Sequence, residues 1–222
     1  MKKRIGYIDY LETIAIFLVV FCHFPSYSGS SIGNIIFQLC AIAVPVFMMA
    51  NGALLLSTKF SLAKHIKKTV LLIFSVLVWK AIYYAAMYCY YKLTNDVDIS
   101  MSIREWYNYL CGINSTDIYI PSEHLWFMYM LISVYIVVPV IALHEDEKKK
   151  DIIVYLSIII FFFVFVVCEV DSVMDIYMHN RGKEWIFLSV FKDSVYPFSW
   201  LCSYLFYFMI GYVIHNKFYL IF

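Results

Sequence analysis

The sequence predicts an all-α protein, a polytopic bundle of transmembrane helices, and three observations lead to this fold class. Of the 222 residues, 63% are hydrophobic and only 15% are charged, which is more apolar surface than a soluble domain of this length can bury. The apolar residues fall into six runs, each long enough to cross about 30 Å of hydrocarbon. Lys and Arg gather in alternate connections between these runs, as the positive-inside rule describes.

Polar connections separate the six predicted spans. Pro45 is expected to kink the second span, because proline lacks a backbone N–H and its ring clashes with the carbonyl four residues earlier. Pro197 is expected in the first turn of the sixth span, where proline is tolerated. Residues 184–195 are expected to lie along the outer interface. The predicted spans are residues 7–24, 35–56, 69–91, 125–143, 152–168 and 196–214.

The positive charges predict the orientation of the bundle. Eleven Lys and Arg residues flank the spans on one side, and five lie in the longer loops of the other side, so we predict that both termini are cytoplasmic. The basic N-terminal residues followed by an apolar run are also typical of a signal peptide. However, Asp9 and Glu12 interrupt the apolar run, and no small-residue cleavage site follows. We therefore expect a retained first helix in a multi-pass protein of the cell (plasma) membrane, with the lipid bilayer as a partner.

Ionisable residues inside the predicted spans are the candidate functional residues, because a charge in a membrane is costly. Asp9, Glu12 and His23 occur in the first apolar run. Glu12 and His23 are eleven residues apart, which places His23 roughly 20° past three full turns, on the same helix face. Glu123 and His124 open the fourth span at the depth of His23. A histidine there can accept a proton from an incoming hydroxyl, although a lone histidine at a helix end is more often interfacial.

Other patterns in the sequence indicate little chemistry. The net charge is +1, and no basic stripe interleaved with aromatic residues indicates nucleic-acid binding. The six cysteines lie mostly in apolar runs without a C-x-x-C pair, so we expect small buried hydrophobes rather than a metal site or disulfides. Residues 29–33 match G-x-S-x-G, but they join two membrane helices instead of a strand and a helix.

Five stretches, in order along the chain, resemble the acyltransferase 3 family of bacterial integral-membrane O-acyltransferases. Residues 4–23 resemble the opening helix of that family, and residues 44–56 resemble its second helix. The basic residues 64–68 are similar to its inner loop. Residues 124–129 (His-Leu-Trp-Phe-Met-Tyr) resemble its most recognisable stretch, and residues 207–212 are similar to a later helix.

The resemblance implies transfer of an acyl group, usually acetyl, from cytoplasmic acyl-CoA to hydroxyls of extracytoplasmic glycans such as cell-envelope glycan or exopolysaccharide. It implies that His23 is the catalytic histidine, with Asp9 and Glu12 beside it on the first helix. Glu123, His124, Trp126 and Lys80 are then expected to contribute to substrate binding. Acyl-CoA enters as a co-substrate, and no tightly bound cofactor and no metal are expected.

The chain departs from the family pattern in two respects. The family arginine falls at position 12, where this chain has Glu12, and a carboxylate cannot replace a guanidinium. Lys80 is expected to supply the cation and to pair with Glu12, because a buried unpaired lysine would be costly. The family has about ten spans and this chain has six, so residues 1–222 are expected to form a single acyltransferase-3-like domain that is incomplete at its C-terminus.

Two other functions are compatible with the sequence. One is a transporter or exporter of a glycan or lipid-linked precursor, with the polar stripe lining its path, although neither related halves nor paired helix interruptions occur. The other is a catalytically inactive, acyltransferase-like partner protein, with Glu12 marking the lost chemistry.

Overall fold

The structure is a computed structural model that describes residues 5–22, 31–95, 101–111, 120, 122–181 and 189–218. Every element of regular structure in these residues is helical. They form two compact units, one made of residues 1–60 with 137–222 and the other of residues 61–136.

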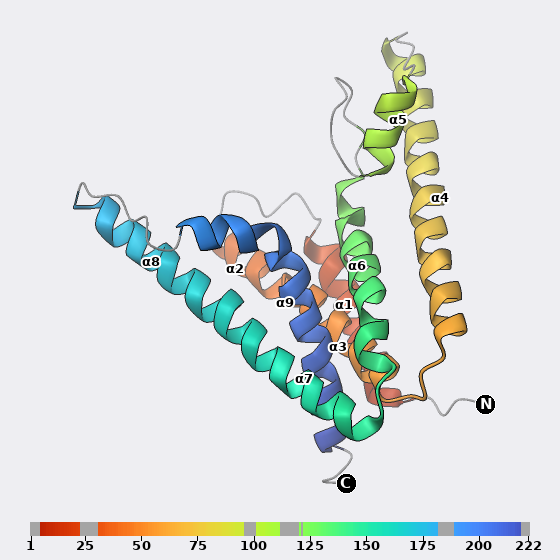
Figure 1. Ribbon diagram of the computed structural model, residues 1–222. Helices are drawn as coiled ribbons and strands as arrows, with labels where there is room; N and C mark the ends of the chain where they lie inside the picture. Colours follow the sequence, from red (N-terminus) through yellow and green to blue (C-terminus); the bar gives the residue numbers. More distant parts are fainter. Residues whose placement is uncertain are drawn as a thin grey trace. The chain divides into compact units, whose positions relative to one another are not determined.

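The first unit contains most of the helices. In Figure 1, α7, η3 and α8 continue one another as a single rod, and α9 bends between its first turns and the rest. The stretch η3 is a π-helix within that rod. The elements of this unit are α1 (Gly6–Cys22), α2 (Ser31–Cys40), α3 (Ala43–Leu56), α7 (Asp146–Ile160), η3 (Phe161–Val167), α8 (Cys168–His179) and α9 (Ser189–Phe218).

Two glycines let α3 and α9 pack closely in the first unit. Gly52 of α3 lies against the backbone of Phe208 in α9, and Gly211 of α9 lies against the backbone of Met49 in α3; a Cβ atom at either glycine would overlap those backbone atoms. Close approach through small residues is how helices associate in membranes, where apolar burial contributes little. The pair of glycines therefore sets the spacing of the central helix pair.

Pro45 breaks the second predicted span, as expected. The helix is interrupted by a turn at Ala41 and Ile42, between α2 and α3. Ala41 is the residue whose carbonyl would accept the N–H that Pro45 lacks. Pro45 then lies in the first turn of α3, where a missing N–H costs nothing. Across the break, Gly33–Leu56 is still long and apolar enough to cross a membrane.

The second unit is built on a long helix. Its elements are α4 (Leu62–Asn95), α5 (Ile103–Leu110), the 3₁₀ turn η2 (Glu123–Leu125) and most of α6 (Trp126–Ala142). Figure 1 shows α5 beside the later turns of α4. The sequence did not predict α5. A capping box begins it: the Ser102 hydroxyl accepts the Glu105 N–H at 3.3 Å, and the Glu105 carboxylate accepts the Ser102 N–H at 2.7 Å.

Several predicted boundaries were wrong. The candidate spans Leu62–Thr94 and Asp146–His179 extend past the predicted 69–91 and 152–168, because their helical hydrogen bonding continues through polar residues beyond the apolar run. The ninth helix begins at Ser189, so Pro197 lies inside it instead of in its first turn, and residues 189–195 belong to this helix. Residues 184–188 lie outside the described part of the chain. Six spans and cytoplasmic termini stay predictions.

Candidate functional site

The predicted site residues are divided between the two units. Asp9 and Glu12 lie on α1 in the first unit, Asp9 exposed and Glu12 half-buried. The Asp9 backbone carbonyl accepts the Thr13 hydroxyl at 2.7 Å. His23 lies outside the described residues, so its placement on the face of Glu12 stays a prediction. The second unit holds the other four: Lys80 on α4, Glu123 and His124 in η2, and Trp126 at the start of α6.

Lys80 is clamped by α5 in the second unit. It is only 2% exposed, and its ammonium donates to the Tyr109 carbonyl at 2.5 Å. The Tyr109 hydroxyl returns a bond to the Lys80 carbonyl at 2.9 Å. The Tyr109 ring lies 4.2 Å from the ammonium and the Tyr129 ring 5.7 Å, within the range of a cation–π interaction. Lys80 thus binds a carbonyl and two aromatic faces within its own unit, and its predicted pairing with Glu12 stays a prediction.

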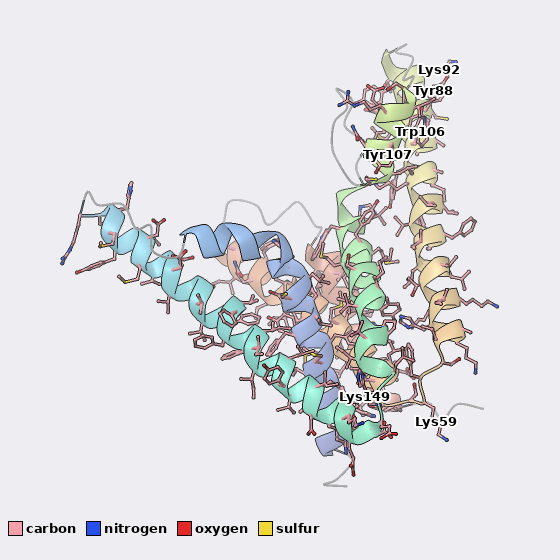
Figure 2. The ribbon with its side chains drawn as sticks, viewed as in Figure 1. Lys59, Tyr88, Lys92, Trp106, Tyr107 and Lys149 are labelled. Carbon is pink, nitrogen blue, oxygen red and sulfur yellow. The ribbon has the colours of Figure 1, made fainter. Side chains whose placement is uncertain are left out.

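Further aromatic contacts hold α5 against its neighbours. Tyr129 of α6 donates its hydroxyl to the Leu110 carbonyl at 2.8 Å, which satisfies an acceptor at the end of α5. The Tyr84 and Trp106 rings are 4.5 Å apart. Figure 2 shows Trp106 and Tyr107 of α5 at the same end of the unit as Tyr88 and Lys92 of α4. We call this end, with Lys80 at its base, the aromatic end of the second unit.

His124 of η2 forms a further link to α4 at the aromatic end. The Tyr83 hydroxyl and the His124 Nε2 are 2.6 Å apart, and the two rings meet edge to face at 4.9 Å. His124 is exposed, as is Trp126 two residues later. Exposed imidazole and indole rings are groups that can bind sugars, through hydrogen bonds and stacking.

The other end of the second unit is basic. Pro139 lies inside α6 and has no N–H for the Tyr135 carbonyl four residues earlier. The buried His65 takes over this role, because its Nε2–H donates to the Tyr135 carbonyl at 2.7 Å. Lys68 donates to the Tyr135 hydroxyl at 2.9 Å. His65 and Lys68 therefore turn toward α6; of the basic residues here His65 is buried, and Lys64, Lys67 and Lys68 are exposed.

The first unit has its own polar cluster. Tyr7 of α1 hydrogen-bonds through its hydroxyl to the Nδ1 of the buried His215 in α9. Lys149 of α7 is 5% exposed and donates to Asp146 at 2.6 Å. Its ammonium lies 5.8 Å from the Tyr212 ring. In Figure 2, Lys149 and Lys59 lie at the same end of this unit. The cluster joins the start of α1, the start of α7 and the last turns of α9.

One comparison with known proteins decides the family. A family model described as an acyltransferase domain, acyltransferase 3, matches residues 5–221 and so runs through both units. The chain belongs to the acyltransferase 3 family. No curated protein and no solved structure matches the chain. The family and the long apolar helices together make the protein a membrane acyltransferase in broad class.

The sequence did not indicate several residues of this acyltransferase that form hydrogen bonds at or near the candidate site. Tyr83 and Tyr109 contact predicted site residues, and His65 caps a carbonyl that the chain itself leaves open. A signal for His65 was present, because a proline inside an apolar helix leaves an acceptor four residues earlier. Among the described residues, no group of three His, Cys, Asp or Glu side chains is arranged to hold a metal ion.

Proposed function

We propose that the protein is a membrane O-acyltransferase that moves an acyl group, acetyl in the simplest case, from cytoplasmic acyl-CoA to a hydroxyl of an extracytoplasmic glycan. The acceptor would be a cell-envelope glycan or exopolysaccharide. The family match over residues 5–221 is the observation that carries the proposal. The separation of a basic end from an exposed His–Trp end within the second unit supports it.

The proposed reaction is one acyl transfer. His23 takes the proton of the acceptor hydroxyl. The oxygen then attacks the thioester carbonyl, the C–O bond forms, the C–S bond breaks and CoA leaves as its thiolate. The role of His23 rests on the family resemblance, and Asp9 and Glu12 are the candidate catalytic carboxylates of the same helix. Lys80 contributes indirectly, because its bond to Tyr109 keeps α5 in place.

The two ends of the second unit are proposed to receive the two substrates. At the basic end, the exposed Lys64 and Lys67 attract the phosphates of CoA. At the aromatic end, His124 and Trp126, with Glu123 beside them in sequence, bind the sugar. Lys67 and Tyr83 are sixteen residues apart on α4, so about 24 Å of helix separates the two ends. That length suits a site in which donor and acceptor approach from opposite sides of a membrane.

The test uses membranes that contain the full chain, incubated with acyl-labelled CoA and the envelope glycan. An acyltransferase releases free CoA and transfers label to the glycan, whereas an exporter consumes no acyl-CoA and an inactive partner transfers no label. Lys64→Gln and Lys67→Gln should each raise KM for acyl-CoA, roughly twofold to fivefold, as the loss of one exposed charge pair predicts. Lys92→Gln, at the other end of α4, is the matched control and should leave KM unchanged.

A further inference from the structure

The contact between Tyr83 and His124 bears on the orientation and the protonation of the His124 imidazole as well as on packing. Their hydroxyl and Nε2 atoms are 2.6 Å apart, a short distance for a neutral hydrogen bond between these groups. Tyr83 is half-buried and its ring is tilted against Trp79, with 6.0 Å between the ring centroids. The Tyr83 ring is therefore packed against Trp79 of the same helix, and its hydroxyl bonds to the exposed imidazole of His124.

The backbone around His124 leaves its ring little freedom. His124 is the middle residue of η2, and the Leu125 N–H donates to the Ser122 carbonyl at 3.1 Å across the turn. Ser122 and Leu125, on either side, are buried. With the main chain fixed in this way, the orientation of the imidazole depends on its side-chain torsions, and the Tyr83 hydroxyl is in a position to set them.

The direction of the hydrogen bond decides where the imidazole proton resides. A phenol hydroxyl is a better donor than an imidazole N–H, and an imidazole nitrogen is a better acceptor than a phenol oxygen, so the favoured arrangement has the Tyr83 hydroxyl donating to the Nε2 lone pair. A neutral imidazole carries one N–H only, and that N–H must then be on Nδ1. In this state neither ring nitrogen has a lone pair left to take a proton from a substrate.

We propose that Tyr83 is a positioning residue that holds His124 as the Nδ1–H tautomer, so that His124 serves the acceptor as a hydrogen-bond donor and not as a base. The oxygen that it binds is an uncharged one, a sugar hydroxyl or ring oxygen. The inference rests on the proposed function for its substrate, and it separates the roles of the two histidines: His23 takes the proton, and His124 orients the sugar.

The tautomer is measured directly, without substrate. Two-bond ¹H–¹⁵N correlation spectra of the ¹⁵N-histidine-labelled full chain in detergent micelles distinguish Nδ1–H from Nε2–H, and His124→Asn assigns the signal. We expect Nδ1–H in the wild type and in Tyr90→Phe, and mainly Nε2–H in Tyr83→Phe. Tyr90 is the matched control, since its hydroxyl makes no hydrogen bond within the part of the chain that the structure describes. Nε2–H in the wild type, or Nδ1–H in Tyr83→Phe, would overturn the proposal.

Kinetics test the role of His124. Tyr83→Phe should raise KM for the acceptor roughly threefold to tenfold, the value of one hydrogen bond, with kcat within about twofold of wild type because the base is untouched. A kcat that falls about a hundredfold at unchanged KM would show that His124 acts as a base. A wild type that transfers no acyl group refutes the proposed function, and the NMR result still decides the tautomer.

Discussion

His65 and Pro139 offer a double-mutant test of how α4 and α6 are joined. Pro139 leaves the Tyr135 carbonyl without its helical donor, and His65 supplies one at 2.7 Å. His65→Phe keeps a ring of similar shape but removes the donor. A buried carbonyl left without a partner costs about 1–3 kcal/mol, so we expect the free energy of unfolding to fall by about that amount.

Pro139→Ala restores a backbone N–H at position 139, which can bond to the Tyr135 carbonyl within α6. In this background, His65→Phe should cost at least about 1 kcal/mol less than in the wild type, because the carbonyl already has a donor. Any other interaction of His65 is lost in both backgrounds and cancels in the cycle. The assay is the free energy of unfolding in detergent micelles or bicelles, with Ile66→Phe, at an exposed neighbour, as the control. Equal costs of His65→Phe in the two backgrounds would refute the reasoning.

Three further predictions follow from the packing and from the cap of α5. Lys80→Met removes the donor to the Tyr109 carbonyl and should cost about 1–3 kcal/mol, seen as faster amide exchange across Ile103–Leu110; unchanged exchange would show that the clamp does not hold α5. Gly52→Ala and Gly211→Ala place a Cβ atom on the backbone of the facing helix and should each cost about 1–3 kcal/mol or more. Gly6→Ala, where a Cβ atom meets nothing within 4 Å, should be neutral in the same thermal unfolding assay. The hydrogen bonds to Ser102 lower the pKa of the Glu105 carboxyl, so the ionised carboxylate favours the cap. That contribution is complete at neutral pH and is lost as the pH falls through the lowered pKa, so the protection factors of the α5 amides, measured relative to intrinsic exchange at each pH, should fall in acid for the wild type but not for Glu105→Gln.

The general architecture could be predicted because each helix, and the break before Pro45, depends on residues that are close together in the sequence. An apolar run of about twenty residues has one stable form in lipid, a helix that satisfies its own backbone, and the break before Pro45 follows from the missing N–H of one residue. The ends of α4 and α8 were not predictable in this way, because hydropathy marks the apolar part of a helix and not where its hydrogen bonds stop. The helix α5 was missed because no apolar run marks it.

For the candidate site, the sequence predicted individual residues but not the contacts that they make. Burial of an ammonium requires a partner, and the sequence predicted that Lys80 would have one. The Tyr109 carbonyl as a partner of Lys80 could not be predicted from the sequence, because Tyr109 belongs to the unpredicted α5. Tyr83 is three residues from Lys80 and thus on a neighbouring part of the same helix face, but its bond to His124 depends on how η2 packs against α4.

The measurement that tests the central claim most directly follows acyl label from CoA into the envelope glycan. It compares the wild type with His23→Ala and with His144→Ala, a histidine in the exposed turn between α6 and α7. We predict label with the wild type and with His144→Ala, and loss of label with His23→Ala at equal amounts of folded protein. Equal labelling with His23→Ala, or no label from the folded wild type in the presence of the glycan, would contradict the account.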